Sequence, residues 1–212
     1  MYLTELNKLI EDGENSQVEF KRKFSTPEKI AKELVAFANT RGGYILFGVD
    51  DDRKIIGVES EKEELELIST AARFYCEPEI DYHTEILSLK KKDIVIITVN
   101  ESRSKPVKLI SDTEDDKKVY IRYKDQSILA SKETIGILKH SNPDSKPLQL
   151  TIGDTEKIVL NYLTENEKIT VKGFKKLANI SERRASRTLI NLVKAEVVRH
   201  HRRDKEEYFT LV

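Results

Sequence analysis

The sequence predicts an α+β fold: a mixed or antiparallel sheet with flanking helices, followed by a small second domain. Apolar runs of strand length alternate with amphipathic helical stretches over about the first 140 residues. A stretch rich in turn-forming residues at 141–147 then precedes a shorter and more basic region. We therefore expect a first domain over residues 1–141, a linker at 142–151 and a second domain over residues 152–212.

The first domain is expected to begin with a helix at about residues 2–12 and a short strand. Val18 and Phe20 alternate with polar residues, so a strand there buries one face and turns the Glu19 carboxylate toward a site or solvent. A helix follows at about 26–40, because Pro27 suits a first helical turn and an apolar stripe ends at a Gly-Gly pair. We interpret that pair as a helix stop.

The rest of the first domain is predicted from apolar runs and turn residues. Strands are expected at 44–49 and 55–58, with Asp50, Asp51 and Asp52 between them. Because Asp suits hairpin turns, at least one of the three is expected to serve only the turn. A helix at about 60–75, strands at 80–89 and 93–99, and a helix at about 131–140 follow.

The second domain is predicted as three helices and a hairpin. A helix opens at Asp154, a short strand covers 169–171, a second helix covers 172–178, Ser181 caps a third helix, and two strands surround a charged turn within 197–211. The helices are expected to bury apolar side chains that include Ile158, Leu177, Ala185 and Leu189. The order resembles a winged helix-turn-helix domain, whose third helix enters the DNA major groove while the hairpin wing follows the backbone.

Charge is distributed unevenly along the chain. The formal net charge is zero, which argues against a generally basic nucleic-acid binder. Residues 151–212 nevertheless contain 13 Lys and Arg against 9 Asp and Glu, whereas residues 1–150 contain 24 against 28. The second domain is therefore the electrostatic candidate for phosphate contact, although a solvated surface is the ordinary fate of such charges. The candidate residues are Arg183, Arg184, Arg187, Arg199, His200, Arg202 and Arg203.

The cellular location is also constrained by the sequence. The single cysteine, Cys76, allows no intrachain disulfide, and the N-terminus lacks a basic-then-apolar signal. No apolar stretch approaches the ~20 residues needed to cross a bilayer. We expect a cytoplasmic protein without a membrane segment.

Several motifs of the first domain occur in one order. They are Glu-Phe-Lys at 19–21, Ala-Phe-Ala-Asn-Thr-Arg-Gly-Gly at 36–43, an apolar strand, Gly-Val-Asp-Asp at 48–51 with a following Gly, Lys-Pro at 105–106, Val-Tyr-Ile-Arg-Tyr at 119–123 and Ser127. Together they resemble the Schlafen-like AlbA_2 domain family over about residues 1–140. One departure is Lys124-Asp125, which stands where the family usually has Gly.

The resemblance implies a metal-dependent nuclease site. It assigns catalytic and metal-binding roles to Glu14, Glu19 and Asp51, with Asp50 as the competitor for the last role. Mg²⁺ or Mn²⁺ would suit such hard oxygen ligands. Lys21, as a further catalytic residue, and Arg22 would then face the charge that develops on the phosphate, and Arg41 is a further candidate for nucleic-acid contact.

Two functions from different classes follow from these expectations. The first is a divalent-metal-dependent endonuclease acting on RNA, tRNA-like in particular, or on single-stranded nucleic acid. The alternative is a non-catalytic DNA-binding transcriptional regulator, in which the AlbA_2 domain oligomerises or senses a ligand. ATP binding is not expected, because neither phosphate-binding glycine motif is present. The vertebrate Schlafen core has two AlbA_2-like lobes that form a groove, whereas the resemblance here covers one lobe. A homodimer that rebuilds the two-lobed groove is therefore expected.

Overall fold

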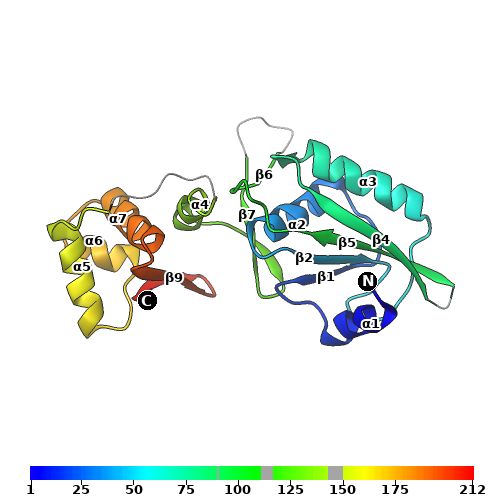
Figure 1. Ribbon diagram of the computed structural model, residues 1–212, viewed down its shortest axis with the longest axis horizontal. Coiled ribbons are helices and arrows are strands. Elements are labelled where there is room, and N and C mark those ends of the chain that lie inside the picture. Colours follow the sequence, from blue (N-terminus) through cyan, green and yellow to red (C-terminus); the bar gives the residue numbers. More distant parts are fainter. Residues whose placement is uncertain (90, 111–116, 143–149) are drawn as a thin grey trace. The chain divides into compact units, whose positions relative to one another are not determined.

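A computed structural model describes residues 1–89, 91–110, 117–142 and 150–212 of the chain (Figure 1). The chain forms two compact units, Met1–Ser131 and Lys132–Val212, each of which is described by itself. No helix within the described ranges is long and apolar enough to cross a membrane.

The first unit is built on a four-stranded mixed sheet in the order β1-β2-β5-β4. β1 (Val18–Lys21) runs parallel to β2 (Gly43–Phe47), and α2 (Pro27–Asn39) connects them. β5 (Lys92–Val99) is antiparallel to both β2 and β4 (Tyr82–Leu89). The mixed sheet agrees with the predicted fold class and leaves β1 at an edge.

Alternating side chains divide the two faces of the sheet between two apolar cores. Ile45 and Phe47 face a core that includes residues of α2 and α3 (Glu61–Phe74). Leu46 faces the other core, with residues of α1 (Leu3–Asp12), which covers the opposite face (Figure 1). All three helices lie inside the ranges expected from the sequence.

Short elements cover the outer side of α2. The hairpin of β7 (Tyr120–Tyr123) and β8 (Gln126–Leu129) packs against this helix, and β6 (Lys108–Leu109) pairs with β3 (Cys76–Glu77). Asn39 holds the helix end to them: its Nδ2 donates to the carbonyls of Val107 at 2.8 Å and Tyr120 at 3.0 Å. This buried side chain therefore braces the fold.

The expected strand at 55–58 is wrong. Ile55 makes one isolated bridge with Val49, and the amides of Ile56 and Gly57 both donate to the Gly48 carbonyl at 2.8 and 2.9 Å. Two successive amides that donate to one carbonyl form a tight turn. The strand pairing that begins at the Val49–Ile55 bridge therefore cannot continue along residues 56–58.

Among its described residues, the second unit contains four helices and a hairpin. They are α4 (Lys132–Leu138), α5 (Asp154–Glu165), α6 (Val171–Leu177), α7 (Glu182–Lys194), β9 (Val198–Arg203) and β10 (Glu206–Leu211). The order of α5, α6, α7 and the hairpin agrees with the sequence prediction. The strand expected at 169–171 is reduced to one bridge between Ile169 and Phe209, because Thr170 already caps α6.

The core of the second unit corrects two burial predictions. Val159, Phe174 and Leu189 are fully buried, but Ile158 and Leu177 are 39% and 44% exposed. Ile158 precedes Val159 by one position and so lies about 100° away around the helix, outside the buried stripe.

The boundary between the units falls before α4. That helix packs along α7, where Ser186 Oγ donates to Glu133 Oε1 at 2.7 Å, and it groups with the second unit. Residues 143–149 of the expected linker lie outside the described residues.

Candidate functional site

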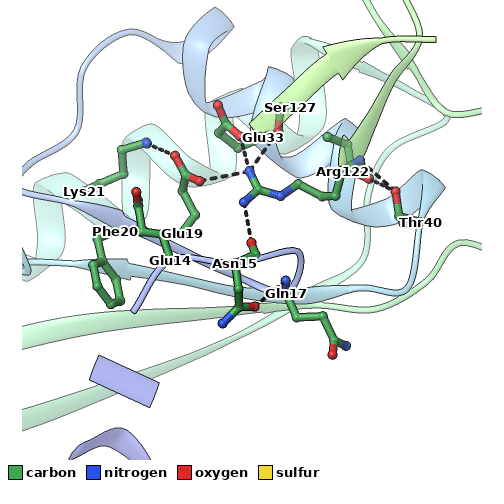
Figure 2. Close-up of polar contacts among 11 residues, drawn as sticks. Glu14, Asn15, Gln17, Glu19, Phe20, Lys21, Glu33, Thr40, Arg122 and Ser127 are labelled. Carbon is green, nitrogen blue, oxygen red and sulfur yellow. Dashed lines mark hydrogen bonds and ion pairs between the residues drawn. The ribbon is translucent and has the colours of Figure 1, made fainter. Parts of the chain in front are cut away.

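A fully buried arginine, Arg122 on β7, lies beside the predicted carboxylates (Figure 2). Its Nη1 donates to Glu19 Oε2 at 2.9 Å, to Glu33 Oε2 at 3.1 Å and to Ser127 Oγ at 3.1 Å. Its Nη2 donates to the carbonyl of Asn15 at 2.8 Å. One guanidinium thus joins the edge strand, the preceding loop, α2 and the β7–β8 hairpin.

The alternation of β1 explains why Glu19 meets this arginine. Val18 and Phe20 point into the core that contains α1, so Glu19 points to the opposite face. The expectation that this face could meet solvent is corrected here, and a role for Glu19 in a site stays a prediction. Glu19 is 7% exposed, because Arg122 and its hairpin cover that face.

Both oxygens of Glu19 already have cationic partners. Oε2 pairs with Arg122 at 2.9 Å, and Oε1 pairs with the ammonium group of Lys21. Sequence analysis assigned Lys21 to catalysis, whereas in the structure this side chain neutralises the carboxylate beside it. Removing either partner would leave part of a buried charge uncompensated.

Glu14 lies beside this cluster and is held by a backbone hydrogen bond. Its Oε1 accepts from the Phe20 amide at 2.8 Å. Burial raises the pKa of Glu14 above its usual value, the negative charges of Glu19 and Asp51 raise this pKa further, and the Phe20 amide opposes the rise. Glu19 and Asp51 are therefore both close enough to act electrostatically on Glu14.

The three consecutive aspartates form a turn. The Asp51 amide donates to Asp50 Oδ1 at 3.0 Å, and the Lys54 amide donates to Asp52 Oδ1 at 3.3 Å. Asp50 and Asp52 thus accept backbone hydrogen bonds within the turn, and the expectation that at least one aspartate serves only the turn stays a prediction. Asp51 itself is exposed, and Asp50 lies 3.7 Å from Arg22 Nε.

Two of the predicted metal ligands, Glu14 and Glu19, have protein partners in the structure. Within the parts of the chain that the structure describes, no group of three or more His, Cys, Asp or Glu side chains is placed to hold a metal ion. Glu19 is engaged by Arg122 and Lys21, and one oxygen of Glu14 is engaged by a backbone amide. Binding of Mg²⁺ or Mn²⁺ by Glu14, Glu19 and Asp51 stays a prediction.

Sequence reasoning missed Glu33 and gave Arg122 no role. Glu33 Oε2 receives hydrogen bonds from Arg122 and from the hydroxyl of Ser127, and its residue is only 9% exposed. The sequence offers no clear signal for its burial, because Glu33 lies on the charged face of α2 with Lys29 and Lys32. The partner itself, 89 residues away, carried no local signal.

The basic residues predicted on α7 are exposed. They are Arg183, Arg184 and Arg187. Arg184 Nη2 donates to Thr155 Oγ1 at 3.0 Å. The guanidinium groups of Arg183 and Arg187 make no hydrogen bond or ion pair to any residue that the structure describes. They are therefore available to an external anion.

The basic residues of the hairpin divide between its two faces. Arg202 Nη1 and His200 Nε2 lie 3.0 and 3.2 Å from the carboxylate oxygens of Glu207, so both are engaged within the hairpin. Arg199 and Arg203 alternate with them on β9 and are exposed.

In the first unit, the two arginines predicted to contact nucleic acid, Arg22 and Arg41, are also exposed.

Comparison with known proteins establishes the family. Residues 14–131, more than half of the 212-residue chain, match the family model described as Schlafen, AlbA_2. The chain belongs to the Schlafen AlbA_2 family. We therefore call the first unit the AlbA_2 unit.

One relative shares only part of its length with this AlbA_2 protein. The AlbA_2 protein is 37% identical over 87 residues to an uncharacterized ATP-binding protein of Ureaplasma parvum, and the match covers 38% of this chain. The chain spans about a quarter, 24%, of that relative.

Two solved structures also align with the chain. A Corynebacterium diphtheriae protein aligns with 72% of this chain and 31% of its own, at 16% identity and a TM-score of 0.49. The N-terminal domain of a Nitrosomonas europaea protein, described as related to the ATP-dependent DNA helicase RecG, aligns with 69% of this chain and 94% of its own, at 15% identity and a TM-score of 0.46.

Proposed function

We propose that this AlbA_2 protein binds nucleic acid through its second unit. In this proposal α5, α6, α7 and the β9–β10 hairpin form a winged helix-turn-helix domain that reads duplex DNA, with α7 in the major groove. The observation that carries the proposal is the pair Arg183 and Arg187. They are exposed and uncompensated on α7, opposite the buried face of Ala185 and Leu189.

The geometry of α7 suits insertion into the groove. Arg183 and Arg187 are four residues apart and so lie on one face of the helix, one turn from each other. The buried stripe of Ala185, Leu189 and Leu192 anchors the other face in the core of the second unit. A helix held in this way presents its arginines as a rigid row.

The hairpin supplies a second basic surface. Arg199 and Arg203 share the face of β9 that lies opposite Phe209, which is buried in the core. Arginine on a wing is suited to phosphate oxygens, which fix the register of a protein on DNA without reading sequence. We therefore assign α7 to base and phosphate contacts and the outer face of the wing to phosphate contacts.

The proposal is tested by the affinity of full-length protein for a labelled duplex and a labelled single-stranded RNA, measured by fluorescence anisotropy. Arg183→Ala/Arg187→Ala should weaken duplex binding strongly. The matched control Lys8→Ala/Lys62→Ala removes two exposed cations from the AlbA_2 unit and should change it little. Equal losses from the two double variants would show that binding follows overall charge and would refute the assignment.

Metal-dependent cleavage by the AlbA_2 unit is a second candidate. One observation favours it: the charges of Glu19 and Asp51 act on Glu14, so the three acids of the family motif share one region. The protein is incubated with labelled tRNA, single-stranded DNA and duplex DNA in Mn²⁺, Mg²⁺ or EDTA. Cleavage that needs metal and is lost in Glu14→Ala and Asp51→Ala would support it, whereas intact substrates with either metal would exclude it for these substrates.

A further inference from the structure

A groove of about 630 Å³ lies between α4 and α7 in the second unit. Its lining includes Lys132 and Gly136 from α4, and Arg183, Arg187 and Ile190 from α7. Gly136 allows the two helices to approach closely, since a Cβ at this position would lie 2.6 Å from Ile190 Cδ1. The groove therefore runs alongside the row of α7 arginines.

The two helices run in the same direction along this groove. Glu133, near the start of α4, is hydrogen-bonded to Ser186, and Gly136, later in α4, meets Ile190 one turn further along α7. Lys132, the first residue of α4, therefore lies at the end of the groove where Arg183 also lines it.

The groove has more positive charge than its own acids neutralise. Lys132, Arg183 and Arg187 form no side-chain hydrogen bond or ion pair with the described residues. The lining has two acids: Glu133 accepts from the neutral Ser186 hydroxyl and keeps its charge, and Glu182 lies 3.6 Å from Lys175. Because Lys194 also lines the groove, an anion that entered it would meet four Lys and Arg side chains against two acids.

We infer that one sugar-phosphate strand of duplex DNA lies in the groove between α4 and α7, with Lys132 as a phosphate contact. The inference rests on the proposed function. A major groove about 12 Å wide admits one helix of about 10–12 Å diameter. When α7 occupies it, the neighbouring α4 cannot enter and, because it packs beside the arginine face of α7, would lie over the strand that borders the groove. A helix outside the winged arrangement thus joins the interface.

The test is a salt titration of duplex binding by the full-length chain. Lys132→Ala should lower affinity by the same factor on every duplex sequence and reduce the slope of log K against log salt by about one unit. Lys132→Glu should lower affinity further, and Lys132→Arg should restore it. Acidic residues favour the first turn of a helix, so Lys132→Glu does not weaken α4 itself.

Lys139→Ala is the matched control, because Lys139 is exposed just beyond α4 and does not line the groove. If Lys132→Ala behaves like Lys139→Ala while Arg183→Ala/Arg187→Ala loses binding, the strand does not lie in this groove and the proposed function stands. If all these variants bind as the parent does, the proposed function itself fails.

Discussion

At the residue scale, Arg122 joins parts of the AlbA_2 unit that are far apart along the chain. Its partners Glu19 and Glu33 lie 103 and 89 residues away, and its side chain is fully buried. Two buried carboxylates require such a cation, because an unpaired buried charge is strongly destabilising. The pairing therefore fixes where the β7–β8 hairpin sits on α2.

Arg122→Met should lower the free energy of unfolding by about 3–5 kcal/mol, because Glu19 and Glu33 would lose their shared partner. Lys21→Met removes a more exposed partner of Glu19 and should cost clearly less. Urea unfolding of the two variants measures the difference. Equal costs would mean that Arg122 does not hold these carboxylates in solution.

Glu14 makes the stability of the AlbA_2 unit dependent on pH. Burial and the charges of Glu19 and Asp51 raise the pKa of Glu14 in the folded state above its usual value of 4.5. The folded state then binds this proton more tightly than the unfolded state. The stability that Glu14 contributes by binding this proton is fully present below its pKa in the unfolded chain. That contribution is lost as the pH rises through its pKa in the folded state.

Glu14→Gln should therefore raise the melting temperature more at neutral pH than at acidic pH, because it removes the charge while its amide oxygen still accepts from the Phe20 amide. Thermal unfolding of wild type and variant between pH 3.5 and 8 measures this. If the variant is less stable than wild type at pH 7, the account is wrong. The hydrogen bond of the charged carboxylate would then stabilise the fold by more than its burial and its repulsion from Glu19 and Asp51 destabilise it.

At the element scale, the end of α2 depends on Gly42. This residue has φ +67°, and a Cβ there would lie 2.4 Å from the Val99 carbonyl oxygen. Gly42→Ala should lower the free energy of unfolding by more than about 1 kcal/mol, because left-handed strain and a backbone clash add. Gly173→Ala in α6, with no Cβ contact below 3.4 Å, should instead stabilise the second unit by about 0.5–1 kcal/mol. Chemical denaturation measures the free energy of unfolding of both variants. A Gly42→Ala variant as stable as wild type would contradict a strained turn at this position.

Elements with local signals were predictable from the sequence, and those that depend on distant partners were not. Ser181 caps α7 through the Arg184 amide, and the Gly-Gly pair ends α2, as expected. The apolar run at 55–58 has the composition of a strand, yet its amides turn back onto Gly48.

The candidate site shows the same division. The motifs marked Glu14, Glu19 and Asp51, but the arginine that covers Glu19 comes from a hairpin 103 residues later. Contacts between residues far apart in the sequence decide whether a carboxylate is free to bind a metal. A short sequence motif does not predict these contacts. The basic face of α7 was predictable because helical periodicity alone separates Arg183 and Arg187 from the buried stripe.

At the scale of the whole molecule, we propose a homodimer. A twofold dimer would bring together two AlbA_2 units, the number of lobes in the vertebrate Schlafen core. It would also present two second units to the two half-sites of a palindromic DNA sequence. Light scattering at micromolar concentration should give about twice the chain mass of 24.5 kDa. A mass near that of one chain would exclude the dimer.

The measurement that tests the central claim most directly is the salt dependence of duplex DNA binding by the full chain and by Arg183→Ala/Arg187→Ala. If the two arginines contact phosphates, the slope of log K against log salt should become shallower by about two units in the variant. A base-reading arginine would instead cost about 1–3 kcal/mol on a preferred sequence and much less on others. An unchanged slope and unchanged affinity on every duplex would contradict the account, because α7 would then be ordinary solvated surface.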